Sequence, residues 1–288
     1  MAAEGPSARG RLVVVATPIG NLDDLAPRAR RALADADRVL AEDTRRTRQL
    51  LTHLGITGKP IERLDAEVEH GAPQARARLV ERLLDGETLV LVSDAGTPVV
   101  SDPGAALVQD AAAEGVVVEP IPGPSAVTTA LMASGLSGER FRFFGFLPRR
   151  GKRRREVLGE LKQTPETVVF FEAPSRMAET LQELGTLVPA RRAVIARELS
   201  KVHEEMVRGT VAELSTREAD RAWQGEITVV LGPRVHAGTA RWDHETLDAR
   251  IDELLASGMR AKDVAKALAL DSGHKSREIY ARIVERKS

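Results

Sequence analysis

The sequence predicts an α/β protein with two tandem α/β domains and a small C-terminal helical bundle. Short aliphatic runs alternate with helical patterns as far as Pro233, the order typical of α/β domains, and beyond it the apolar spacing is purely helical. Apolar residues make up 42% of the 288 residues and aromatic residues only 3%. The strands must therefore bury Val, Leu, Ile and Ala, as the strands of parallel sheets do.

The first α/β domain is predicted over residues 11–122, behind a disordered N-terminal segment, 1–10. Its expected strands are the aliphatic runs at 12–16, 39–40, 88–92 and 116–121. A helical pattern over roughly 104–113 separates the last two runs, which is typical of a βαβ crossover. The stretch "EDTRRTRQLLTHLG" predicts another helix, with Asp43 or Thr44 as its N-cap and Gly55 at its end.

The second α/β domain is predicted over residues 123–234, and a helical accessory or RNA-binding region over 240–288. Expected strands of the second domain are 167–171, 193–196 and 226–231, and Ser125 is expected to cap its first helix. The final region has helical spacing over 247–255, 261–270 and 277–284.

Loops rich in Pro and Gly follow four of the predicted strands, at 17–21, 93–98, 122–126 and 172–176. In open α/β sheets, ligands bind at the carboxyl ends of the strands, so these loops are candidate binding loops. They contain few cations and no phosphate-binding glycine motif, which favours a neutral or zwitterionic ligand over a polyphosphate. Within "VSDAGTPVVSDPG", Asp94 is assigned to the ligand and Asp102 to the N-cap of the following helix.

Composition excludes several classes of protein. Lys plus Arg and Asp plus Glu both number 42, so any attraction to nucleic acid must be local, and the absence of Cys excludes disulfides and fits a reducing cytoplasm. Neither a signal peptide nor a membrane-spanning apolar run is present, which predicts a soluble cytosolic protein. The six histidines lack metal-ligand spacing, and "DAEVEH" at 65–70 is interpreted as a solvated acidic loop, so we expect no metal.

The segment "RRGKRRR" has six cationic residues in seven positions and is the strongest local signal for RNA. The expected phosphate contacts are Arg149, Arg150, Lys152, Arg153, Arg154 and Arg155. The preceding phenylalanines, Phe141, Phe143 and Phe144, are expected to fill the buried side of a strand rather than to stack bases. Cations of the final helices, at 260, 262, 266, 275 and 277, offer a further surface for RNA, and their short turns allow a helix-turn-helix.

Eight segments together resemble the 16S ribosomal RNA cytidine-2′-O-methyltransferases of the tetrapyrrole methylase superfamily. They are "VATPIGNLDDLAPRA", "AEDTRRTRQLL", "VSDAGTPVVSDPG", "PIPGPSA", "FFGFLPR", "FFEAPSR", "ARELSK" and "AKDVAKALAL". The resemblance covers about residues 10–286 and implies a two-domain enzyme that binds S-adenosylmethionine in the cleft between its domains. It also implies 16S rRNA of the small ribosomal subunit as the substrate and a homodimer as a frequent state.

The resemblance also indicates site residues. The implied cofactor wall consists of Pro18, Ile19, Asp94, Gly96, Thr97, Ser125 and Ala126, with Ala173, Leu199 and Thr228 from the second domain. Ser175 departs from the His that many members have in its place, which leaves the role of this position open.

The methyl acceptor is a weakly acidic hydroxyl, so the reaction needs a proton acceptor. Asp43 and Glu172 are the candidates because each follows a strand at the expected cleft, and Arg45 and Arg176 are candidates for holding phosphates. The alternative for Asp43 is a helix cap. Two other functions remain open: a tetrapyrrole C-methyltransferase, and a non-catalytic nucleic-acid-binding protein that uses its final helices.

Overall fold

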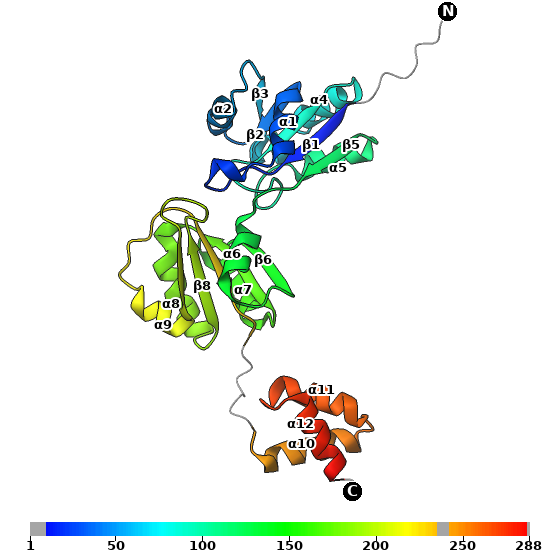
Figure 1. Ribbon diagram of the computed structural model, residues 1–288, viewed down its shortest axis with the longest axis vertical. Helices are drawn as coiled ribbons and strands as arrows, with labels where there is room; N and C mark the ends of the chain where they lie inside the picture. The colour runs from blue at the N-terminus through cyan, green and yellow to red at the C-terminus, as the bar shows by residue number, and fades with distance from the viewer. Residues whose placement is uncertain (1–9, 235–241, 287–288) are drawn as a thin grey trace, which may run out of the picture.

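The computed structural model describes residues 10–234 and 242–286, so nearly all of the segment predicted as disordered, 1–10, lies outside the described residues. Figure 1 shows two α/β units in succession and a group of helices at the C-terminal end. A search of the described residues finds no helix long and apolar enough to cross a membrane.

The first sheet is entirely parallel, with strand order β3-β2-β4-β1-β5. Its strands are β1 (Arg11–Val15), β2 (Arg38–Ala41), β3 (Ile61–Arg63), β4 (Leu89–Val92) and β5 (Val117–Ile121). Its helices are α1 (Pro27–Asp35), α2 (Thr44–His53), α3 (Ala66–Gly71), α4 (Pro73–Leu84) and α5 (Ala105–Ala113), with a short 3-10 turn η1 (Leu22–Asp24). Leu12, Leu40 and Leu91 pack on one face and Val13, Val39 and Val90 on the other, so alternate residues of each strand fill two cores. Burial of both faces explains the continuous aliphatic runs.

The second sheet has strand order β6-β7-β10-β8-β9, and only its β6–β7 pair is parallel. The strands are β6 (Phe141–Phe146), β7 (Thr167–Glu172), β8 (Arg192–Arg197), β9 (Glu205–Thr210) and β10 (Ile227–Leu231). The helices are α6 (Ala126–Ser134), α7 (Gly151–Gln163), α8 (Met177–Leu187) and α9 (Val211–Arg217), with a 3-10 turn η2 (Pro174–Arg176). One face of the sheet packs against α7, α8 and α9, and the other packs against α6 and against Ile19 of the first unit.

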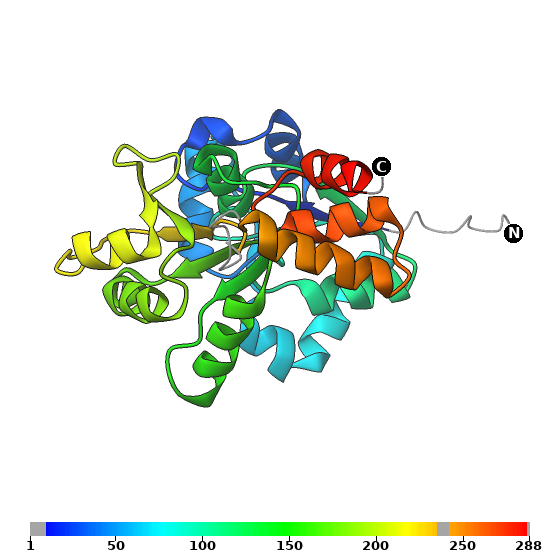
Figure 2. The same ribbon diagram turned by 90° about the horizontal axis from the view of Figure 1, so that it is seen from below.

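The C-terminal helices are α10 (His244–Ala256), α11 (Ala261–Asp271) and α12 (Ser276–Glu285). They share an apolar core that includes Leu247, Ile251, Val264 and Ile279. Figures 1 and 2 show them as one compact group. Their five predicted RNA-facing cations are all exposed.

The predicted fold class is confirmed, with differences in detail. In the first sheet, β1 lies between β4 and β5, so the expected crossover skips one strand. The stretch 65–70 is not a solvated loop, because Asp65 caps α3 and Glu69 is buried, accepting a hydrogen bond from Ala106 N at 2.7 Å. Phe141 and Phe146 are exposed, so the aromatic strand is only partly buried. Strands β3 and β9 and helices α3, α4, α7 and α9 were not predicted.

Candidate active site between the two sheets

A cavity of about 400 Å³ lies between loops of the first sheet and the second sheet. Its size falls in the range of small-molecule sites. The first unit contributes Ile19, Glu42, Arg46, Asp94, Ala95, Val100, Ser101 and Asp102, and the start of α6 contributes Ser125, Ala126 and Val127. The second sheet contributes Phe146, Phe171, Glu172, Pro174, Gly225, Glu226, Ile227 and Thr228. Loops on both sides therefore enclose one site.

Five carboxylates and a single arginine line this cavity. Burial raises the pKa of Glu42, and the nearby carboxylate of Asp94 adds to the effect. Burial, followed by repulsion from Glu42 and Asp94, raises the pKa of Asp102 to about 6. The one cation, Arg46, lies 3.8 Å from Asp94. Glu172 and Glu226 are paired with Arg176 and Lys201, so the negative charge of the cavity comes from Glu42, Asp94 and Asp102. The cavity therefore suits a ligand with cationic groups, not a polyphosphate.

Backbone bonds hold the β4 loop against the β1 loop. Thr17 and Gly96 exchange two backbone hydrogen bonds of 2.8 and 3.0 Å, and Ser93 Oγ donates to Gly96 O at 2.8 Å. Gly96 has a φ of +91°, a conformation that side chains other than glycine rarely adopt. Thr97 Oγ1 donates to Pro124 O at 3.2 Å and so ties in the loop before α6. These bonds fix the wall from which Asp94 and Asp102 face the cavity.

The predicted cofactor residues divide into two groups. Those that line the cavity are Ile19, Asp94, Ser125, Ala126 and Thr228. The others, Pro18, Gly96, Thr97, Ala173 and Leu199, are not part of its lining. Gly96 and Thr97 support the wall from behind, and Leu199 packs beside Ile19 in the apolar core.

Neither predicted proton acceptor has a free carboxylate in the cavity. Asp43 caps α2 by accepting hydrogen bonds from the backbone of Arg45 and Arg46, which lower its pKa, and it does not line the cavity. Glu172 lines the cavity but is 1% exposed. Its carboxylate accepts hydrogen bonds from Thr180 Oγ1 and Ala173 N, both at 2.8 Å, and pairs with Arg176 at 2.5 Å. Both carboxylates hold local structure.

The assignment of Asp102 as a helix cap is wrong. The N-cap of α5 is Gly104, with a φ of +126°, and no side chain caps this helix. A Cβ atom on Gly104 would lie 2.5 Å from a Leu91 methyl carbon, so the chain approaches the sheet here and leaves Asp102 beside Glu42 and Asp94. Ser125, also predicted as a cap, is the N-cap residue of α6, but its side chain makes no capping hydrogen bond.

The basic run precedes and begins α7, and one of its members is not available to RNA. Arg154 is 5% exposed and donates hydrogen bonds to Glu183, Thr180 and the Pro148 carbonyl. It is therefore a structural residue, contrary to the prediction. The remaining members, Arg149, Arg150, Lys152, Arg153 and Arg155, are exposed.

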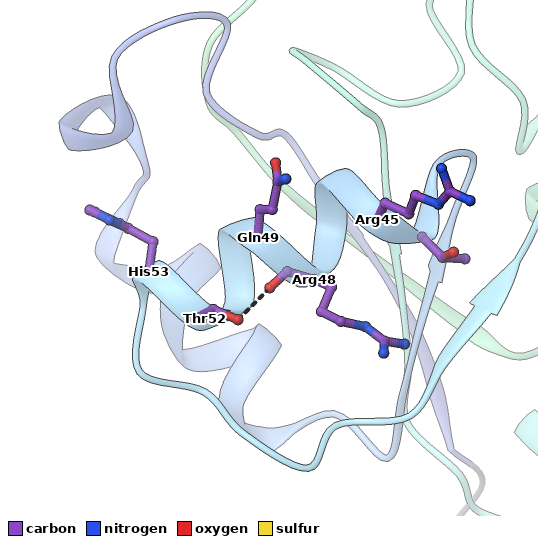
Figure 3. A pocket seen from close by; sticks show the side chains of 6 residues that line it. Arg45, Arg48, Gln49, Thr52 and His53 are labelled. Carbon is purple, nitrogen blue, oxygen red and sulfur yellow. Dashed lines mark hydrogen bonds between the residues drawn. The ribbon is translucent and has the colours of Figure 1, made fainter.

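Arg45 lies apart from the cavity, on the outer side of α2. Together with Thr44, Arg48, Gln49, Thr52 and His53 it lines an open hollow formed by this one helix. Figure 3 shows these side chains projecting from successive turns and the hydrogen bond of 2.8 Å from Thr52 Oγ1 to Arg48 O. With two arginines and no carboxylate, this hollow is suited to anions.

The sequence did not point to several of the residues that line the cavity. They are at positions 42, 46, 100–102, 146, 171 and 225–227. Gly225 and Glu226 precede β10, and Ile227 is its first residue. Because β10 is antiparallel to β7, its amino-terminal end lies at the cavity. No group of His, Asp or Glu that could hold a metal ion occurs among residues 10–234 and 242–286.

Comparisons with known proteins identify the family. The family described as "Tetrapyrrole (Corrin/Porphyrin) Methylases" matches residues 11–215. A protein of Halalkalibacterium halodurans named "Ribosomal RNA small subunit methyltransferase I" is 42% identical over 275 residues, covering 94% of both chains. A Mycobacterium bovis protein of the same name is 45% identical over 283 residues, covering 96% of this chain and 95% of the relative.

A solved structure shows the same fold. The uroporphyrin-III C-methyltransferase from Thermus thermophilus complexed with S-adenyl homocysteine has a TM-score of 0.53 and 18% identity. The match covers 77% of this chain and 97% of that one. The chain belongs to the tetrapyrrole methylase family and is a methyltransferase.

Proposed function

We propose that this methyltransferase uses S-adenosylmethionine to methylate the ribose 2′-oxygen of a cytidine in 16S rRNA of the small ribosomal subunit. The names of the relatives support the rRNA substrate. The observation that supports this cofactor is the cavity, whose lining has five carboxylates and one arginine. S-adenosylmethionine is small and carries a positively charged sulfur and an ammonium group, so it fits this charge and size. From the family resemblance we further propose a cytoplasmic homodimer, and light scattering after size exclusion tests the dimer.

Ile19, Asp94, Ser125, Ala126 and Thr228 would hold the cofactor, since these predicted residues line the cavity. When bound, S-adenosylmethionine supplies a methyl group on sulfur that is transferred by in-line displacement, and the sulfur becomes neutral. The contribution of the protein is to align the acceptor oxygen and to remove its proton. The hydrogen-bonded β4 loop provides the rigid wall that such alignment requires.

For the proton acceptor we propose Asp102 in preference to Asp43 and Glu172. Asp102 lines the cavity, and its pKa of about 6 is closer to neutrality than that of an ordinary carboxyl group. A proton acceptor works best when its pKa lies near the working pH. Asp43 and Glu172, by contrast, are engaged in capping and in buried ion pairs.

The exposed cations of the α7 start, Arg149, Arg150, Lys152, Arg153 and Arg155, are proposed to contact RNA phosphates. Arg45 and Arg176 are proposed to do the same from α2 and η2. Each phosphate contact releases counterions, so RNA binding should weaken steeply as salt is raised.

Methyl transfer from radiolabelled S-adenosylmethionine to small ribosomal subunits that lack the modification tests this function. The expected result is one methyl group per subunit, resistant to alkaline cleavage at a cytidine because the 2′-oxygen is blocked. Transfer to a base would replace the ribose assignment, and absence of transfer to either subunits or free 16S rRNA contradicts the proposal.

A further inference from the structure

A second hollow, which is not the one on α2, opens beside the cavity. Its volume is about 730 Å³, and it shares one residue with the cavity, Phe146. Its lining is Phe146, Leu147, Pro148, Arg149, Ala173, Ser175 and Arg176. It contains two arginines and no carboxylate, whereas the cavity contains five carboxylates and one arginine. Two adjoining hollows of opposite charge therefore meet at a single aromatic ring.

We propose that this second hollow, the nucleotide pocket, receives the target nucleotide of the RNA, with its base stacked on Phe146 and its phosphate at Arg149 and Arg176. The inference rests on the proposed function and deepens it. The negative cavity repels a phosphate backbone and attracts a cationic methyl donor, while the nucleotide pocket has the reverse preference. A nucleotide held there presents its ribose at the shared wall, next to the donor.

Phe146 has the properties of a stacking platform. It is 58% exposed although it is large and apolar. Its ring contacts the ring of Phe171 with centroids 5.3 Å apart and an interplanar angle of 60°, so it is supported from one side. RNA enzymes commonly read unstacked bases on exposed aromatic side chains, because such rings bury the base face without needing a hydrogen-bond code.

Arg176 is held in place before any RNA binds. Its Nη2 lies 2.5 Å from Glu172 Oε1, and its Nη1 donates to the Leu147 carbonyl at 3.0 Å. Arg154 Nη1 also lies 3.7 Å from Glu172 Oε2 and pairs with Glu183 as well, so Glu172 is shared by two guanidinium groups. Glu172 is thus a positioning residue that fixes the cation of the pocket.

Steady-state methylation of small ribosomal subunits by Phe146→Leu, Phe146→Tyr and Arg149→Ala tests the inference. Phe146→Leu keeps apolar bulk toward the cavity but removes the ring, so we expect kcat/KM for the subunit to fall about tenfold or more. Phe146→Tyr keeps the ring and should stay within about threefold of the wild type. Arg149→Ala should raise KM several-fold and reduce the salt dependence of RNA binding by about one phosphate contact.

Calorimetric binding of S-adenosylmethionine is the second readout. It should change less than about threefold in Arg149→Ala, because Arg149 lines only the nucleotide pocket, and in Phe146→Leu it should change less than kcat/KM does, because Phe146 lines both hollows. Lys162→Ala, which removes an exposed cation at the far end of α7, is the matched control for charge and should behave as the wild type. If the wild type methylates subunits while Phe146→Leu and Arg149→Ala keep full kcat/KM, the nucleotide pocket is refuted and the proposed function stands. If the wild type transfers no methyl group to subunits, the proposed function fails, and this inference with it.

Discussion

The two walls of the cavity differ in architecture and in chemistry. The wall from the first unit consists of loops after parallel strands and supplies Glu42, Asp94 and Asp102. The wall from the second unit consists of the ends of mixed strands and supplies two aromatic rings, the start of β10 and two ion-paired carboxylates, Glu172 and Glu226. The first wall is therefore suited to a cation and to accepting a proton, and the second to stacking and shape. Under the proposed function, the first unit would supply the chemistry and the second would place the substrate.

The largest expected effect is that of Asp102→Asn, which removes the proposed proton acceptor from the first wall. Turnover should fall at least about a hundredfold, the usual contribution of a general base, while S-adenosylmethionine binding weakens only several-fold. Single-turnover transfer to small subunits measures the chemical step. Asp43→Asn should retain most of the turnover and most of the stability, because Asn also caps helices. Equal losses from both substitutions would remove Asp102 from its assigned role.

Two neighbours in the basic run give the next prediction, which concerns the stability of the second unit. Arg154→Ala leaves Glu172 and Glu183 without their buried partner and should lower the free energy of unfolding by about 3–5 kcal/mol. Arg153 is exposed, so Arg153→Ala should change the free energy of unfolding by less than about 0.5 kcal/mol. Urea unfolding followed by circular dichroism checks both values. Similar stabilities of the two variants would contradict the structural role of Arg154.

The same contrast explains how far the sequence could predict the site. Parallel strands place all their carboxyl ends on one edge, so the loops at 17–21, 93–98 and 122–126 could be identified from the strands before them. That rule fails for β10, whose antiparallel direction brings its start, Gly225–Thr228, to the cavity. Antiparallel pairing is a long-range property that no local pattern reveals.

Two individual residues were misassigned for different physical reasons. Arg154 shares a helical face with Val157, Leu158 and Leu161, and this spacing was visible in the sequence, but the charge of the run concealed it. Asp102 precedes a Pro-Gly pair and a helix, as a cap residue often does. Its true place depends on positive φ angles at Val99 and Ser101, which the sequence does not suggest for such residues.

A smaller effect is expected at the junction of the two walls. Ser200 Oγ accepts a hydrogen bond from Asn21 N at 3.0 Å and donates one to Asp24 Oδ2 at 2.6 Å, which joins the two units. Ser200→Ala removes both bonds from an exposed site, so S-adenosylmethionine binding should weaken by about twofold to tenfold, with little change in overall stability. Calorimetric titration measures the affinity for S-adenosylmethionine. Thr186→Ala, which removes an exposed hydroxyl bonded only within α8, is the control, and an equal change there would show that the junction does not shape the cavity.

The smallest effect is a pH dependence of stability that should belong to the first wall alone. The pKa of Asp102 is about 6 in the folded chain and 3.8 when unperturbed, so between these values the folded state binds more protons than the unfolded state. Its contribution to stability is therefore fully present below about pH 4 and is lost as the pH rises through 6. Since Asp102 is only partly buried, solvent screening should limit this loss to about 1 kcal/mol or less.

Asp102→Asn should be more stable than the wild type at pH 8 and equal to it at pH 4. A saturating cationic ligand should reduce the difference at pH 8, because it stabilises the ionised carboxylate. Thermal unfolding at both pH values measures this. A difference that does not change with pH would mean that the carboxyl group ionises normally and that the first wall lacks the electronegative character assigned to it.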